Sequence, residues 1–387
     1  MRNNSIVPKL IPVMLAFFAM GFVDLVGIAT NYIKIDFSLS DSLANLFPSM
    51  VFVWFLVFSI PTGMLMNRIG RRNTVLISLA LTSFALIIPL VFYSFASMLI
   101  SFALIGIGNA LMQVSLNPLL AGIVTGEKLA SSLTFGQFIK AIASFIAPII
   151  AGWAAISLGD WKILFGVFTI IAVIATVYLF LTKIPEQTND GRISTFKESF
   201  QLFEDKLVTF MFIGILVHVG IDVGINTTGP KLLIERAGMH LEEAGYITSL
   251  YFICRTIGCF AGAFILANFS SYKFFYISVF VMLIAMIGLF FSFSTVLIYI
   301  CVGLIGFGNS NIFPIIFSRA LQHLPERRNE ISGLMITGIF GGALFVAAMG
   351  IVSDLMGGQI GAIVILILCV SFLVFLTTKM KTKEADS

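Results

Sequence analysis

Long apolar segments, separated by short polar ones, follow one another along almost the whole chain. Runs rich in Leu, Ile, Val, Phe and Ala recur from Leu10 to Thr378. A helix needs about 20 apolar residues to cross the hydrocarbon core of a bilayer. The pattern therefore predicts an all-α membrane protein with twelve spanning helices. Their expected ranges are about 10–33, 43–66, 74–95, 97–124, 130–156, 161–182, 207–231, 243–267, 273–294, 296–322, 331–355 and 358–379.

Composition excludes a soluble protein. Hydrophobic residues make up 59% of the chain, charged residues only 11%, and the mean hydropathy is +1.05. The first apolar run follows Arg2 and Lys9, but it is longer than a signal peptide needs and has no clear cleavage site. We expect it to be the first span and the lipid bilayer to be a partner of the whole chain.

The distribution of Lys and Arg predicts the orientation, because these residues stay on the cytoplasmic side of a membrane. With both termini cytoplasmic, only Lys34, Lys162, Lys231 and Arg236 fall on outer loops, and the spans hold Lys140 and Arg255. All other Lys and Arg lie on the inner side. The net charge of +4 is thus a membrane-orientation signal, which gives no support for a nucleic-acid partner.

Two short repeats indicate a duplication. Gly106-Ile-Gly-Asn109 returns as Gly306-Phe-Gly-Asn309, and Asp24 in the first span has a counterpart in Asp222 at nearly the same offset. We therefore expect two pseudo-symmetric six-helix bundles, residues 1–182 and 207–387. A polar cytoplasmic linker, 183–206, joins them and carries a short surface helix from Phe196 to Phe203. Such halves can rock about a central site, which is the geometry of alternating access.

The segment between the second and third spans carries a motif. Its key positions are Gly63, Asn67, Arg68, Gly70, Arg71 and Arg72. This segment resembles the signature loop of the major facilitator superfamily, with Asn67 where that family usually has Asp. The resemblance implies a gating loop that stabilises one access state through its arginines and helix ends. On this basis we expect Asn67→Asp to strengthen the loop's contacts. The second-half copy, Asn268 to Lys273, is degraded.

Charged groups within spans are costly, about 2.5–3.5 kcal/mol each on insertion scales, and therefore need a reason. The spans hold Asp24, Lys140, Asp222 and Arg255, with His218 beside Asp222. One interpretation is internal pairing, Asp24 with Lys140 and Asp222 with Arg255. The other is function. We expect Asp24 and Asp222 to serve proton coupling, with Asp24 buried in an apolar helix.

Uncharged amides complete the candidate site. Asn109, Gln113 and Asn117 recur every four residues and therefore share one helix face. Side-chain amides both donate and accept hydrogen bonds, which suits a substrate rich in hydroxyls. The residues expected to bind substrate are Asn109, Gln113, Asn117, Gln137, Lys140, His218, Asn226, Arg255, Asn309 and Asn311.

Three stretches, Asn117-Pro118, Gln137 with Lys140, and Ile253 to Gly258, resemble the fucose and galactose proton symporter branch of the superfamily. In that branch acids on the first and fourth helices serve proton and sugar. Asp24 matches the first, whereas Gln113 stands about where the second would be. Lys140 occupies a position where the branch's fucose transporter has a neutral amide.

The resemblance implies a monomeric secondary transporter of a bacterial-type inner membrane, importing a sugar or sugar derivative with protons. The alternatives are a carrier of sugar acids held by Lys140 or Arg255, a multidrug exporter, and a sensor without transport. An enzyme is not expected, because His218, His240 and His323 are scattered and no nucleophile–base pair, catalytic group, metal site or cofactor motif emerges.

Overall fold

The computed structural model describes residues 7–39, 43, 46–186, 195–239, 241–244 and 246–380. Within these ranges the protein is all-α, and twelve helices are long and apolar enough to span a membrane. Residues 187–194 of the predicted linker and His240 lie outside the described residues. The predicted spans are confirmed, with most boundaries within a few residues, and the short helix predicted within the linker begins at Phe196 as expected.

The described residues form two compact units. Unit 1 holds residues within 1–125, 136–200 and 325–337, and unit 2 holds residues within 126–135, 201–324 and 338–387. The start of the fifth span thus clusters with the second half, and the start of the eleventh clusters with the first. These two exchanged segments occupy equivalent places in the two sequence halves. The division into bundles 1–182 and 207–387 stays a prediction about the duplication.

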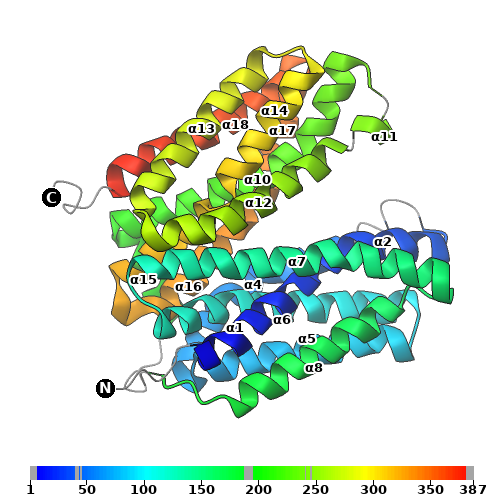
Figure 1. Ribbon diagram of the computed structural model, residues 1–387, viewed down its shortest axis with the longest axis vertical. Helices are drawn as coiled ribbons and strands as arrows, with labels where there is room; N and C mark the ends of the chain where they lie inside the picture. The colour runs from blue at the N-terminus through cyan, green and yellow to red at the C-terminus, as the bar shows by residue number, and fades with distance from the viewer. Residues whose placement is uncertain are drawn as a thin grey trace. The chain divides into compact units, whose positions relative to one another are not determined.

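Unit 1 is built from antiparallel spans, of which α5 packs against both α6 and α8 (Figure 1). Its helices are α1 (Val7–Met20), η1 (Gly21–Asp24), α2 (Leu25–Asp36), α4 (Leu46–Ile69), α5 (Arg71–Val91), α6 (Phe95–Ile123), most of α7 (Glu127–Leu158), α8 (Ile163–Leu181), α9 (Phe196–Gln201), η3 (Pro325–Arg327) and α16 (Arg328–Thr337). Ser94 separates α5 from α6, because its side chain and that of Ser97 form a reciprocal capping box.

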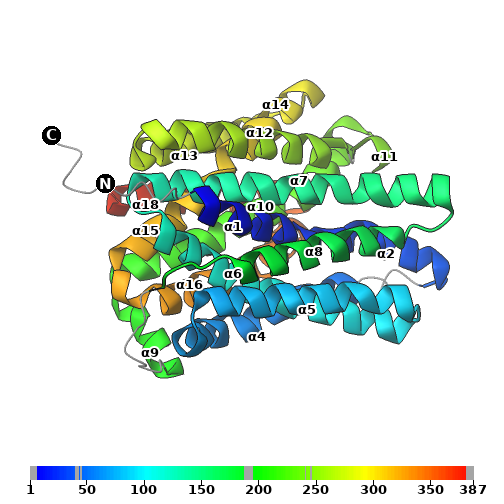
Figure 2. The same cartoon turned by 60° about the horizontal axis from the view of Figure 1, so that its bottom comes forward.

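In unit 2, α10 contacts α12, α14, α15, α17 and α18, and α14 packs against both α12 and α13 (Figure 2). The helices are η2 (Leu202–Glu204), α10 (Lys206–Ala237), α11 (Leu241–Ala244), α12 (Tyr246–Asn268), α13 (Ser271–Phe291), α14 (Thr295–Asn309), α15 (Ile312–His323), η4 (Gly338–Phe340), α17 (Gly341–Met356) and α18 (Ile360–Met380). Gly341 permits a close helix approach, since a Cβ there would lie 2.0 Å from the carbonyl oxygen of Leu216.

Asp205 starts α10 by accepting hydrogen bonds from the backbone N–H groups of Leu207 and Val208. Its second oxygen lies 2.8 Å from Nε2 of His323, at the end of α15. Burial alone would raise the pKa of Asp205, but the His323 hydrogen bond and the two backbone N–H groups together lower that pKa below its ordinary value. This contact fixes the end of one long span against the start of another.

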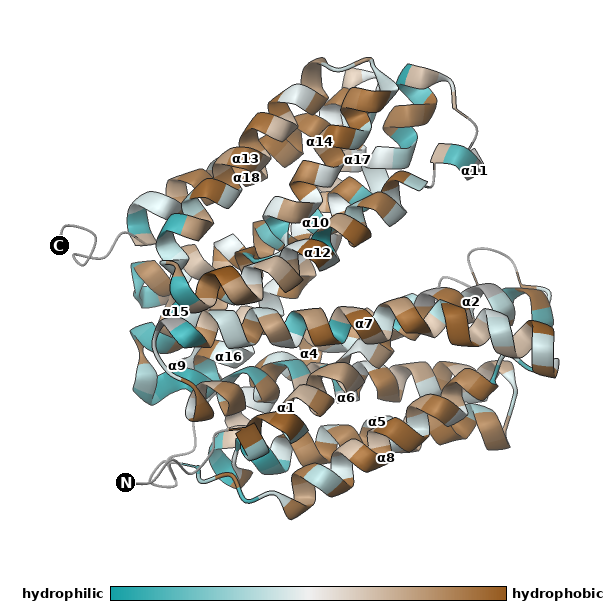
Figure 3. Ribbon diagram, viewed as in Figure 1, coloured by the Kyte–Doolittle hydropathy of each residue, from teal (hydrophilic) through white to brown (hydrophobic). Residues whose placement is uncertain are grey.

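The distribution of hydrophobic residues along the helices is typical of a membrane protein. The long helices are hydrophobic over most of their length, and hydrophilic residues gather on α9 and at helix ends (Figure 3). Three spans are interrupted where polar or glycine residues occur: the first at η1, the tenth at Ser310 and Asn311, and the eleventh at η4. Interrupted spans free backbone groups inside the membrane, and such breaks are tolerated where they line a cavity or other protein atoms satisfy them.

Candidate functional site

Asp24 ends the 3₁₀ segment that interrupts the first span. Its side chain is exposed, whereas Phe22, Val23 and Leu25 around it are buried. The expectation that Asp24 is buried in an apolar helix is therefore wrong. The break turns the carboxylate out of the packed interior of unit 1.

Helix α7 holds this break in place. The Ser144 hydroxyl lies 2.5 Å from Asp24 Oδ2 and 3.1 Å from the carbonyl oxygen of Lys140, so its one proton bonds the nearer carboxylate with the carbonyl as the alternative acceptor. Gly21 allows the close approach, because a Cβ there would lie 2.5 Å from the Lys140 carbonyl oxygen. In the part of the chain that the structure describes, no ion pair joins Asp24 to Lys140. The pairing expected for these two residues is absent there.

The amides of α6 support the break from the other side. Asn109 donates from Nδ2 to the carbonyl oxygen of Met20 at 2.7 Å, which satisfies a backbone group at the start of the 3₁₀ segment. Gln113 donates to Oδ1 of Asn109 at 2.8 Å, and Asn117 donates to the Gln113 carbonyl. All three amides are buried. The predicted common face is confirmed, but these side chains hold one another and the backbone, so they act first as a scaffold for Asp24.

Gln137 lies one turn before Lys140 on α7, as predicted, and both side chains are half-buried. Among the described residues neither makes a side-chain hydrogen bond or ion pair. They are therefore unit 1 candidates that a substrate can contact without displacing a hydrogen-bond partner, and Asp24 has one oxygen, Oδ1, beside the one that Ser144 binds.

Unit 2 contains a connected polar network on α10, α12 and α14. Arg255 Nη1 lies 3.0 Å from Asp222 Oδ2, which confirms the ion pair expected from the sequence. Tyr251 donates to Asp222 Oδ1 at 2.5 Å, and Asn309 donates to the Tyr251 oxygen at 3.0 Å. His218 Nδ1 lies 2.8 Å from Asn309 Oδ1. We call these five residues the Tyr251 network.

Tyr251 is the member that sequence reasoning missed. It is fully buried and lies one helical turn before Arg255, a spacing that puts both side chains on one face of α12. The neighbouring amides are bound to the backbone. Asn226 donates to the Asp222 carbonyl at 2.7 Å, and Asn311 donates to the Gly258 carbonyl at 2.9 Å.

The gating loop forms a one-residue turn between α4 and α5. Gly70 has φ +85°, a backbone conformation that favours glycine, and α5 begins at the next residue. Glu186 accepts hydrogen bonds from the backbone N–H groups of Arg71 and Arg72 at 2.5 and 2.7 Å. The Arg72 guanidinium donates to carbonyls at the end of α8, those of Leu179, Phe180 and Thr182. The negative Glu186 thus lies at the N-terminus of α5, and the positive Arg72 side chain lies at the C-terminus of α8, as the two helix dipoles favour.

The same loop contacts α16. Asn67 Nδ2 donates to Glu330 Oε1 at 3.0 Å, and Asn329 donates to Asn67 Oδ1 at 2.5 Å. Arg71 Nε donates to Asn329 Oδ1 at 2.6 Å. Gly63 makes room, since a Cβ there would lie 2.8 Å from the Asn329 carbonyl oxygen. Arg68, by contrast, is exposed. Glu330 therefore supplies an acid beside the position where this chain has Asn67.

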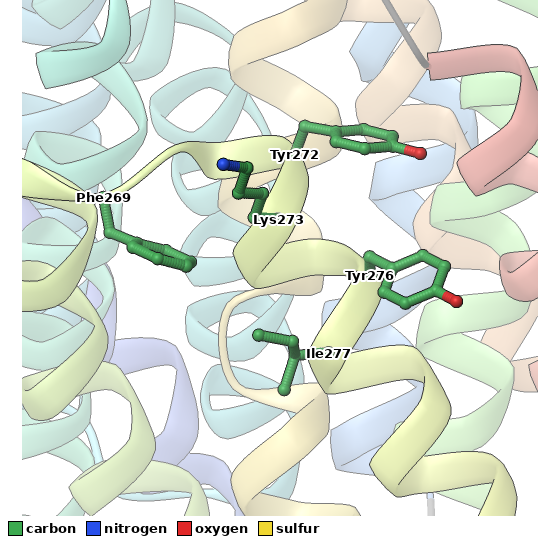
Figure 4. Close-up of a pocket in the computed structure, with 5 residues that line it drawn as sticks. All are labelled: Phe269, Tyr272, Lys273, Tyr276 and Ile277. Carbon is green, nitrogen blue, oxygen red and sulfur yellow. The ribbon is translucent and has the colours of Figure 1, made fainter. Parts of the chain in front are cut away.

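A shallow pocket of about 320 Å³ lies at the junction of α12 and α13, in the segment identified as the degraded copy of the loop. Figure 4 shows Lys273 between Phe269 and the rings of Tyr272 and Tyr276, with Ile277 below. None of the predicted site residues lines this pocket. Aromatic and lysine side chains at the end of a span are typical of the membrane interface, so we do not assign the pocket to the transport site.

Comparison with known proteins places these features in context. The family model described as Major Facilitator Superfamily matches residues 13–347. A glucose/galactose transporter of Brucella abortus is 25% identical over 383 residues, covering 93% of this chain and 91% of the relative. A hexuronate transporter of Bacillus subtilis is 25% identical over 272 residues, covering 66% of this chain and 64% of the relative.

The fold also resembles solved structures. A crystal structure of the E. coli fucose:proton symporter FucP superposes with a TM-score of 0.84, covering 99% of this chain and 100% of that one. The two sequences are 18% identical. This likeness concerns the fold, and it agrees with the all-α, twelve-span architecture described above.

Proposed function

The chain belongs to the major facilitator superfamily, and we propose that it is a proton-coupled importer of a neutral hexose working by alternating access. Members of this family are transporters, not enzymes. Support for a hexose comes from the relatives named as glucose/galactose transporters, which match over most of their length. The structural likeness to a fucose:proton symporter supports a proton as the driving ion.

The proposal rests most on the position of Asp24, whose side chain is exposed at the break in the first span. A carboxylate exposed at a break in a spanning helix can bind and release a proton, whereas one packed in apolar surroundings must wait for water to reach it. Asn109 and Ser144 hold the break through direct hydrogen bonds. Protonation of Asp24 would remove the charge that Ser144 now stabilises, and the break could then change its packing against α7.

The substrate is proposed to bind beside Asp24, with Gln137 and Lys140 as the side chains still able to bond its hydroxyls. We propose that the protein acts as a monomer in the inner membrane with both termini cytoplasmic, as the charge pattern predicts. The gating loop stabilises one access state through its contacts with α16. In this account the amides Asn109, Gln113 and Asn117 position Asp24 and do not bind the sugar directly.

The test is uptake by the purified protein in proteoliposomes. An inward proton gradient should drive accumulation of labelled glucose or galactose above the external concentration, and a protonophore should abolish it. If sugar accumulates to the same level with and without the proton gradient, proton coupling is contradicted. Failure of both hexoses to enter or to compete would contradict the hexose assignment.

One observation favours a second candidate, a carrier of hexuronates or similar anions. Lys140 has no ion-pair partner among the described residues, and an uncompensated cation in a span is costly unless a bound anion neutralises it. The similarity to a hexuronate transporter points the same way. Competition of a uronic acid against the matching aldose discriminates between the two candidates.

A further inference from the structure

The Tyr251 network has a definite direction of hydrogen bonding. Asn309 uses its Nδ2 donor on the Tyr251 oxygen, so its Oδ1 faces His218 and can only accept. His218 must therefore carry a proton on Nδ1. The Tyr251 hydroxyl, which receives a hydrogen bond from Asn309, directs its own proton to Asp222 Oδ1.

Both oxygens of Asp222 consequently face donors. Oδ1 accepts from Tyr251, and Oδ2 lies 3.0 Å from the Arg255 guanidinium, which has no acceptor to offer. A proton on Asp222 would not need to displace these donors, because each oxygen has a second lone pair, but it would remove the negative charge that attracts Arg255 and would weaken the hydrogen bond from Tyr251. Tyr251 and Asn309 are each 0% exposed, so the Tyr251 hydroxyl has no water to bond in place of the carboxylate.

Asp24 is in the opposite situation. Its side chain is exposed, it accepts a hydrogen bond from the Ser144 hydroxyl, and no ion pair engages it among the described residues. A hydroxyl can reverse its role and accept a hydrogen bond from a protonated carboxyl, whereas a guanidinium cannot. The two acids that the sequence presents as equivalent are therefore in chemically different surroundings.

We propose that Asp222 and Arg255 form a fixed ion pair, oriented by Tyr251, Asn309 and His218, and that Asp24 alone carries the coupled proton. Tyr251 is then a positioning residue that keeps Asp222 on Arg255. This inference rests on the proposed proton coupling and refines it: one proton accompanies each sugar, and Asp222 is a counter-ion that takes no part in proton transfer.

The decisive comparison is between removing one charge and removing both. Asp222→Asn removes the carboxylate charge that faces Arg255 and should abolish uphill sugar accumulation. Asp222→Asn combined with Arg255→Gln removes the pair as a unit and should restore accumulation with the wild-type ratio of one proton per sugar. A double variant that does not regain accumulation overturns the proposal. Asp354→Asn, which alters an exposed acid at the end of α17, is the matched control and should behave as wild type.

Tyr251→Phe tests the positioning role. In the wild-type background it should lower the accumulation rate about tenfold, a typical coupling between residues in direct contact. In the Asp222→Asn/Arg255→Gln background it should have no further effect, because there is no carboxylate left to orient. An equal loss in both backgrounds would mean that Tyr251 only supports packing. Tyr246→Phe, an exposed tyrosine on the same helix, is the control.

A stability measurement tests the ion pair independently of whether transport is coupled to protons. If wild-type protein transports sugar without a proton requirement, the proposed function fails. The melting temperatures of the purified variants still test the ion pair. Asp222→Asn should melt lower than the wild type, and adding Arg255→Gln should recover most of that loss. No recovery would overturn the fixed pair independently of transport.

Discussion

Asn67 donates a hydrogen bond to Glu330 across 263 positions of sequence, with 3.0 Å between Nδ2 and Oε1. Both side chains are buried, and Asn329 and Arg71 extend the contact. The acid that the family usually carries at position 67 is thus absent, but an acid on α16 faces that position. In this chain the contact therefore has its acid on α16 and an amide at position 67.

This contact reverses the expectation drawn from sequence that Asn67→Asp strengthens the loop. An aspartate there would face Glu330 at hydrogen-bond distance, and two buried like charges repel. We expect Asn67→Asp to lower the free energy of unfolding by about 1–3 kcal/mol, the cost of losing a buried hydrogen bond and leaving its partner unsatisfied. The melting temperature of the purified protein measures the change.

The compensating variant is Asn67→Asp with Glu330→Gln, which places one acid and one amide in the same two positions. It should recover most of the lost stability. If Asn67→Asp is as stable as wild type, or if Glu330→Gln brings no recovery, the contact between the two residues does not stabilise the loop.

Glu186 caps the first turn of α5, and its loss should also be measurable. Glu186→Ala removes the acceptor for two backbone N–H groups and an anion at a helix N-terminus, which costs about 0.5–2 kcal/mol. Glu204→Ala, an exposed acid in η2, is the control and should change stability little. Equal melting temperatures for the two variants would contradict the capping role.

Gly21 is expected to tolerate no side chain. A Cβ at this position would lie 2.5 Å from the Lys140 carbonyl oxygen and 2.8 Å from Cβ of Ala143, so Gly21→Ala should push the 3₁₀ segment away from α7. Overpacking of this kind costs about 1–3 kcal/mol, and transport should fall with it. Gly152→Ala on α7 has open space around it and should be silent in both assays. Wild-type transport by Gly21→Ala would show that the close approach is dispensable.

Lys140 discriminates between the two substrate classes. If the substrate is a neutral hexose, Lys140→Gln should keep detectable binding of galactose. If the substrate is an acid, the same variant should lose binding of galacturonate almost completely, because the cation proposed to bind the carboxylate is gone. Equilibrium binding of the two sugars to wild type and variant provides the comparison, with Lys273→Gln as a control in a surface lysine. Selective, Lys140-dependent binding of the acid would replace the hexose assignment.

The sequence predicts the spans well because the thickness of the bilayer sets a minimum length of apolar sequence for every spanning helix. The ion pair between Asp222 and Arg255 also follows from sequence, since few charges in the spans leave few combinations. The break at Gly21–Asp24 does not, because nothing local distinguishes it from a continuous helix: it exists through Asn109 and Ser144, which are distant in sequence. Tyr251 and Glu330 were missed for the same reason, as their roles depend on partners brought together by folding.

The most direct test of the account concerns Asp24, the exposed acid at the helix break. Asp24→Asn keeps the shape of the side chain and can still accept a hydrogen bond from Ser144, but it cannot carry a proton. In proteoliposomes we expect this variant to exchange labelled hexose across the membrane at a substantial rate. Under an inward proton gradient it should not raise internal hexose above the external level. If Asp24→Asn still accumulates hexose against its gradient, Asp24 does not carry the coupled proton and the central claim is contradicted.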